Sequence, residues 1–147
     1  MLKPNAFLAL AAVGWADGNL DATEGQGLLS AAAKYGMAGS DLAAIEQAIR
    51  SPVTIADVDT MGMSRGERAI TFALATWMAH LDGVVTASES ATLILLGDRL
   101  GIPLGIRQRA GDAAMQVAEQ SAGRPDKYDF EALEQRLRAK LGDLDAE

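Results

Sequence analysis

Three carboxylates and one amide surround a single predicted turn near the N-terminus. The segment reads Asp17-Gly-Asn-Leu-Asp21-Ala-Thr-Glu24. Carboxylate and amide oxygens are the ligands that hard divalent cations bind in proteins. The residue types therefore predict a cation site formed by Asp17, Asp21 and Glu24. Calcium suits such a flexible cluster better than magnesium, which demands octahedral geometry, and we expect calcium rather than magnesium or zinc.

The start of this segment, D-x-N-x-D, imitates the calcium loop of an EF-hand. An EF-hand loop has glycine at its sixth position and glutamate at its twelfth. This chain has Ala22 and Leu28 there instead. The segment is therefore not an EF-hand.

A structural role explains some of the same acids without a metal. Asp21 is suited to the N-cap of a helix that begins at residue 22, and Glu24 then falls at N3 of a capping box. Acidic side chains near a helix N-terminus are also favoured by the helix dipole. The sequence alone does not decide whether these acids cap the helix, bind a cation, or do both.

The acidic turn occurs twice, because residues 7–37 recur in degraded form as residues 72–102. A repeat preserves first what each unit needs for packing. The matched pairs are Phe7 with Phe72, Asp17-Gly18 with Asp82-Gly83, Glu24 with Glu89, Leu28 with Leu93, and Gly36 with Gly101. Thr86 replaces Asp21 and can still cap, whereas Asp82 and Glu89 are retained although the N-cap requires neither. The second copy therefore adds Asp82 and Glu89 to the predicted metal site.

The apolar spacing is helical almost throughout, which predicts an all-α protein. The expected helices cover roughly residues 4–16, 22–36, 41–50, 65–81, 87–100, 104–120 and 127–141. With short connections they form a single-domain bundle of about seven helices over residues 1–147. The repeat makes its two helical hairpins equivalent, related by an approximate twofold axis.

Helix boundaries are marked by residues that favour helix ends. The expected N-terminal caps are Asp21, Ser40, Ser64 with Glu67, Thr86 with Glu89, and Asp126 with Asp129, and the expected C-terminal stops are Gly36 and Gly101. Gly25 and Gly27 lie early in the second helix, where glycine costs about 1 kcal/mol against alanine. They indicate either a close backbone approach or a weak helix start.

The amino-acid composition limits the classes of partner and the cellular location that we expect. The net charge is −7, and an acidic surface repels phosphate backbones, so no nucleic-acid partner is expected. Divalent cations and basic protein surfaces are better candidates. Cysteine is absent, and neither a signal peptide nor an apolar run of about 18 residues is evident. We therefore expect a cytoplasmic protein that does not insert into membranes.

The two acidic segments together resemble the tellurite-resistance protein TerB and its TerB-like relatives. The resemblance lies in Trp15-Ala-Asp17-Gly18…Glu24…Leu28-Leu29 and in His80-Leu-Asp82-Gly83…Glu89…Leu93, and it covers about residues 5–120. It implies an all-helical domain and a role in resistance to tellurite or other chemical stress, often within membrane-associated protein assemblies. It also implies metal binding by the acids at positions 17, 24, 82 and 89. Leu81 and Thr86 depart from the pattern, so the second half-site is expected to be weaker.

Several other residues have two interpretations. His80 is either a metal ligand or a packed amphipathic residue in the place of Trp15. The aromatic residues Trp15, Trp77, Phe7 and Phe72 are expected in the core, and Met61, Met63, Met78 and Met115 are expected to fill gaps in it or to form an apolar groove. Arg107, Arg109, Arg124, Arg136 and Arg138 form either a basic face or ordinary solvated helix surfaces.

Catalytic signatures are missing from the sequence. It has one histidine, no G-x-S-x-G element and no phosphate-binding GK[ST] loop. The leading hypothesis is therefore a metal-binding stress-response protein that is not an enzyme. The alternative is a metal-independent scaffold whose acidic face meets a basic protein partner, and a metal-dependent hydrolase is a distant third.

Overall fold

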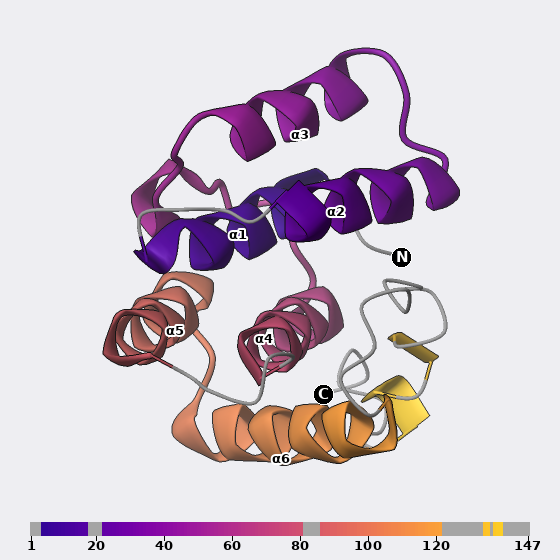
Figure 1. The fold of residues 1–147 in the computed structure, drawn as a ribbon. Coiled ribbons are helices and arrows are strands. Elements are labelled where there is room, and N and C mark those ends of the chain that lie inside the picture. Colours follow the sequence, from indigo (N-terminus) through magenta and orange to yellow (C-terminus); the bar gives the residue numbers. More distant parts are fainter. Residues whose placement is uncertain (1–3, 18–21, 81–85, 122–133, 136, 140–147) are drawn as a thin grey trace.

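The computed structural model describes the backbone of residues 4–17, 22–80, 86–121, 134–135 and 137–139. Within these residues the chain forms helices and no strands (Figure 1), which confirms the all-α prediction. The elements are α1 (Pro4–Gly14), η1 (Trp15–Asp17), α2 (Ala22–Lys34), α3 (Ser40–Arg50), η2 (Ile55–Asp57), α4 (Arg65–His80), α5 (Ala87–Leu100) and α6 (Leu104–Ser121). Of the expected helix over 127–141, residues 134–135 and 137–139 are described and helical, and its cap at Asp126 and Asp129 lies outside them.

Helix α4 lies at the centre of the bundle (Figure 1), with α1, α5 and α6 packed against it. Every side chain from Ala69 to Ala79 is buried. A helix that is apolar on all faces must be covered on all faces. Its two buried hydroxyls are satisfied within the helix, because Thr71 Oγ1 donates to the Glu67 carbonyl at 2.7 Å and Thr76 Oγ1 to the Phe72 carbonyl at 2.9 Å.

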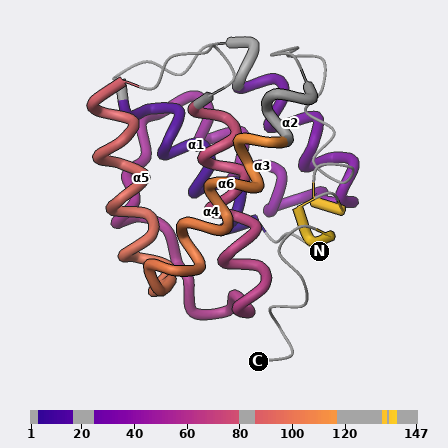
Figure 2. The backbone as a smooth tube through the Cα atoms, turned by 90° about the horizontal axis from the view of Figure 1, so that it is seen from below, coloured from indigo at the N-terminus to yellow at the C-terminus, as the bar shows by residue number. Residues whose placement is uncertain are grey.

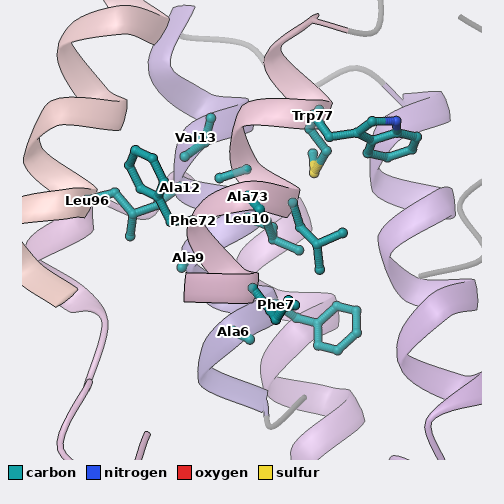
Figure 3. Packing of buried hydrophobic residues seen from close by; sticks show 14 of the residues in the cluster. Ala6, Phe7, Ala9, Leu10, Ala12, Val13, Phe72, Ala73, Trp77 and Leu96 are labelled. Atoms are coloured by element: carbon teal, nitrogen blue, oxygen red, sulfur yellow. The ribbon is translucent and has the colours of Figure 1, made fainter. Parts of the chain in front are cut away.

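The core forms where the alanine-rich α1 meets α4. Figure 3 shows Ala9 and Ala12 of α1 close to Phe72 and Ala73 of α4. Small side chains on α1 allow the two helices to approach closely, and larger ones fill the remaining space. The described cluster joins aromatic and aliphatic residues from α1, α4 and α5, namely Phe7, Leu10, Val13, Phe72, Trp77 and Leu96.

Two of the sequence expectations for the core need correction. Trp15 is only half-buried, and its indole N–H donates to the Ala48 carbonyl at 2.8 Å, which ties the end of α1 to α3. Met63 and Met78 are buried as expected, but Met61 is 89% exposed and Met115 is 38% exposed. Met61 lies on the connection before α4, where no helix covers it.

The predicted N-terminal caps are confirmed at α4 and α5. At α5 the Glu89 amide donates to Thr86 Oγ1 and the Thr86 amide donates to a Glu89 carboxylate oxygen, both at 3.1 Å. At α4 the Glu67 amide donates to Ser64 Oγ at 3.1 Å. The cap at Ser40 is wrong. Gly39 takes the N-cap position with φ of 61°, so α3 begins one residue earlier and Ser40 lies inside it.

Helices α2 and α5 end in the same way, at Gly36 and Gly101, where φ is 85° and 67°. In each case the amide that follows the glycine donates to the carbonyl five residues before it, at 3.2 Å for Met37 and 3.1 Å for Ile102. The amide of the glycine itself donates three residues back. This is the Schellman motif, which needs a left-handed residue that glycine adopts without strain. Both predicted stops are confirmed.

Gly25 marks the close approach of α2 to α3. A β-carbon at this position would lie 2.6 Å from Ile49 Cγ2, nearer than real β-carbons come to other atoms. The prediction of a close backbone approach is therefore confirmed at Gly25. The absence of a side chain here is a packing requirement between two helices.

A buried carboxylate ties the C-terminal helical residues to the end of α2. Tyr35 Oη donates to Glu134 Oε1 at 2.7 Å, and Arg138 Nε donates to Glu134 Oε2 at 2.8 Å. Burial raises the pKa of Glu134, but the hydrogen bonds from Tyr35 and Arg138 and the charge of Arg138 outweigh it, so the pKa is lowered overall. Leu137, fully buried one turn along, packs into the same core.

The capping box predicts the effect of Thr86→Ala. The variant loses the acceptor for the Glu89 amide and should lose roughly 0.5–2 kcal/mol of unfolding free energy. Urea denaturation measures this loss. Ser90→Ala, an exposed change in the same helix, is the control and should stay within about 0.5 kcal/mol of wild type. Equal midpoints for the Thr86 variant and wild type would show that the cap adds no stability.

The close approach at Gly25 predicts that Gly25→Ala destabilises the fold, although alanine is the better helix former. The added methyl group would overlap Ile49 Cγ2, and overpacking costs about 1–3 kcal/mol. In an Ile49→Ala background the same substitution should be neutral or stabilising, by up to about 1 kcal/mol. A stabilised Gly25→Ala single variant would contradict this packing.

The lowered pKa of Glu134 predicts a stability difference that depends on pH. A carboxyl group with a lowered folded-state pKa adds stability above its unfolded value, near 4.5. That contribution is lost as the pH falls through the folded value. Wild type should therefore exceed Glu134→Gln in stability at neutral pH, and the difference should shrink in acid. Denaturant midpoints between about pH 3 and pH 7 measure it, and a gap independent of pH would refute it.

Candidate functional site

Three of the five predicted metal ligands lie in described elements next to the two predicted turns. Asp17 ends η1, Glu24 lies in the first turn of α2, and Glu89 lies in the first turn of α5. Asp21 and Asp82 lie outside the described residues, as do the side chains of Asp17 and Glu24. Glu89 is therefore the member of the set whose side chain the structure describes.

The backbone places η1, the element that precedes the first turn, against α5, the helix that follows the second turn. Helix α1 packs beside α5, and η1, which continues α1 and ends with Asp17, also contacts α5. Figure 2 shows α1 and α5 next to each other. Helix α5 begins at Ala87, two residues before Glu89. The arrangement thus places η1, which ends with Asp17, against the helix that carries Glu89.

Glu89 acts as a cap, and its carboxylate is half-buried. One of its oxygens accepts the Thr86 amide. A carboxylate has about four lone-pair sites, so this bond leaves acceptor capacity for a cation. Capping and cation binding are therefore compatible at Glu89.

Among the described side chains, no group of three or more aspartates, glutamates or histidines comes together. Four of the five predicted ligands are outside that search. The predicted site therefore stays a prediction. The side chain of His80, the last residue of α4, also lies outside the described set, so its two interpretations remain open.

Two of the five arginines of the predicted basic face are paired with carboxylates, so they contribute less positive charge to that surface. Arg107 donates to the Ile102 carbonyl at 2.7 Å and pairs with Asp98 at 3.0 Å. Its guanidinium lies against Gly97, where a β-carbon would come within 2.8 Å of it. Arg138 pairs with Glu134, and Arg109 is exposed on α6. Arg124 and Arg136 lie outside the described residues.

Two arginines that the sequence analysis did not single out hold the connection between α3 and α4. Arg68 donates to three carbonyls, those of Met63 at 3.1 Å, Leu100 at 2.8 Å and Thr60 at 2.8 Å. Arg99 donates twice to the Val58 carbonyl, at 3.1 and 2.9 Å. The connection is thereby fixed against the start of α4 and the end of α5. Nothing in the spacing of a helical arginine signals such partners.

A cavity of about 560 Å³ opens beside Arg68, where the start of α4, the end of α5 and the start of α6 meet. Most of its described lining residues are apolar, polar and apolar atoms share the wall almost equally, and Arg65 and Arg68 carry its charge. The lining residues are Met63, Arg65, Arg68, Ala69, Leu100, Gly101, Ile102, Pro103 and Ile106. Its volume falls in the range of small-molecule sites.

No described helix combines the length and the apolar character needed to cross a membrane. No protein-family model, curated protein or solved structure matches the chain.

Proposed function

We propose that this chain is a TerB-like binding protein that acts without catalysis and holds a divalent cation at its paired acidic turns. The observation that carries the proposal is the contact of η1 with α5. That contact brings η1, which ends with Asp17, against the helix whose first turn carries Glu89, and this supports a shared site for the two copies of the acidic motif. Binding there would serve a cytoplasmic response to tellurite or a related chemical stress.

We also infer that residues 7–37 and 72–102 are equivalent hairpins related by an approximate twofold axis. The identical Schellman motifs at Gly36 and Gly101 support this inference, because they occupy matching positions of the repeat. Phe7 and Phe72, which also match, are both buried. Two equivalent hairpins would present their acidic turns in a symmetric pair.

The ends of the helices that precede these turns favour a cation there. Asp17 ends η1, directly after α1, and Asp82 follows α4 by two residues. The C-terminal end of a helix carries partial negative charge, which disfavours a carboxylate there. N-capping cannot explain acids at this position. A bound cation would offset both the dipole and the repulsion among Asp17, Asp21, Glu24, Asp82 and Glu89.

The alternative function is a metal-independent scaffold, and the outer face of α5 favours it. Ile94 and Leu95 are 61% and 57% exposed on the helix that also carries Glu89. An exposed apolar patch next to acidic residues suits a protein partner with a basic rim. Such a partner would belong to a membrane-associated assembly of the kind that the family resemblance implies.

The cation proposal predicts stabilisation by calcium. A ligand that binds the folded state alone adds about 2.7 kcal/mol at a concentration one hundred times its dissociation constant. For a chain of this size that raises the melting temperature by about 2–4 °C per kcal/mol. We expect calcium in the millimolar range to raise the melting temperature more than magnesium or zinc, with matching heats in calorimetry.

The control is a pair of variants with the same change of charge. Asp17→Asn/Glu24→Gln should lose the response to calcium. Asp41→Asn/Asp112→Asn, which neutralises two exposed acids on α3 and α6, should keep it. If millimolar calcium shifts neither melting nor calorimetric signals of wild type, or shifts both double variants equally, the acids do not form the site and the scaffold function leads.

A further inference from the structure

The cavity beside Arg68 has the charge and the shape of a binding site for an organic anion. Its apolar wall comes from three segments: the connection before α4, α4 itself, and the stretch from the end of α5 into α6. Met63, Leu100 and Ile102 are buried core residues that reach this wall. The wall can therefore receive a short apolar chain without any change of fold.

Arg68 brings to this cavity a half-buried positive charge whose described partners are all neutral. Its three hydrogen bonds go to backbone carbonyls at 2.8–3.1 Å, and no carboxylate among the described residues pairs with it. A guanidinium has five N–H donors, so the three bonds leave two for a ligand. Removing a cation from water without a counter-charge is costly, and a bound carboxylate would offset that cost.

Arg65 adds a second positive charge at the cavity, from the first residue of α4. Glu67 lies between the two arginines in sequence, but it is buried and does not line the cavity. Of the other nearby arginines, Arg107 pairs with Asp98 and Arg99 donates to the Val58 carbonyl. Among the described lining residues, the charged ones are both arginines.

The backbone at the cavity also favours a negative ligand. Helices α4 and α6 both begin here, and helix N-termini carry partial positive charge. At the C-terminal end of α5, which also lies at the cavity, backbone carbonyls already accept hydrogen bonds. Its Leu100 carbonyl accepts from Arg68, and its last turn is closed by the amides of Gly101 and Ile102.

We propose that this cavity binds a small monocarboxylate with a short apolar chain. Its carboxylate pairs with the guanidinium groups of Arg65 and Arg68, and its chain packs against Met63, Leu100 and Ile106. The site is separate from the acidic turns: it lies at the start of α4, whereas the second acidic turn follows the end of α4. The two sites can therefore be tested independently.

The test is calorimetric titration of the full chain with sodium octanoate, in EDTA so that divalent cations play no part. Octanoate should bind saturably, with a dissociation constant on the order of 0.1–1 mM for a ligand of this size. Acetate has the charge without the chain, and octan-1-ol has the chain without the charge. Each should bind at least about tenfold more weakly, because each lacks one of the two interactions.

The location is tested with Arg65→Glu. The residue is exposed, and an acid in the first turn of a helix is favoured, so the variant should fold. It should weaken octanoate binding by about tenfold or more, and Arg65→Gln should weaken it less. Arg109→Glu makes the same charge change on α6 at an exposed residue that does not line the cavity, and it should leave binding within about twofold of wild type.

Four results would overturn the proposal. They are no saturable binding of octanoate to wild type, equal weakening by Arg65→Glu and Arg109→Glu, octan-1-ol binding as tightly as octanoate, and acetate binding as tightly as octanoate. The third would show that the arginines do not contribute, and the fourth that the apolar wall does not.

Discussion

The burial of α4 on every side is the constraint on which the rest of this structure depends. All side chains from Ala69 to Ala79 are buried, so α1, α5 and α6 must each cover one face of the helix. Only the two ends of α4 can therefore contribute to a binding site. The start of α4 lines the arginine-bearing cavity, and its end leads into the second acidic turn. Both proposed sites therefore take their positions from the same buried helix.

The two proposed sites carry opposite charge, and each lies next to helix ends whose partial charge has the sign of that site. The cavity lies at the starts of α4 and α6, where helix dipoles add to the charge of Arg65 and Arg68. The acidic turns follow the ends of α1 and α4, where the dipoles oppose Asp17 and Asp82. One end of the bundle is thus prepared for an anion. The other holds more negative charge than its helices favour, which a cation or a basic partner would offset.

Local sequence signals predicted the helices well, because their causes are local. The Thr86–Glu89 box and the glycine stop at position 101 rely on bonds within a few residues. The prediction for Ser40 was wrong because Gly39, which has no side chain to cap with, takes the N-cap position with φ of 61° and α3 begins at Ser40 itself. The cavity could not be predicted. Arg68 reaches carbonyls at positions 60, 63 and 100, and only the packed fold brings these together. The acidic site stays a prediction, made from a repeated spacing that local capping does not require.

The most direct test of the account asks whether the two acidic turns act as one cation site. Amide signals of the chain can be followed by two-dimensional NMR during a calcium titration. The account predicts that signals around Asp17 and Glu24 shift together with those around Asp82 and Glu89, along one binding curve, while α3 and α6 stay unchanged. Shifts confined to one turn, two separate curves, or no shift at millimolar calcium would contradict it.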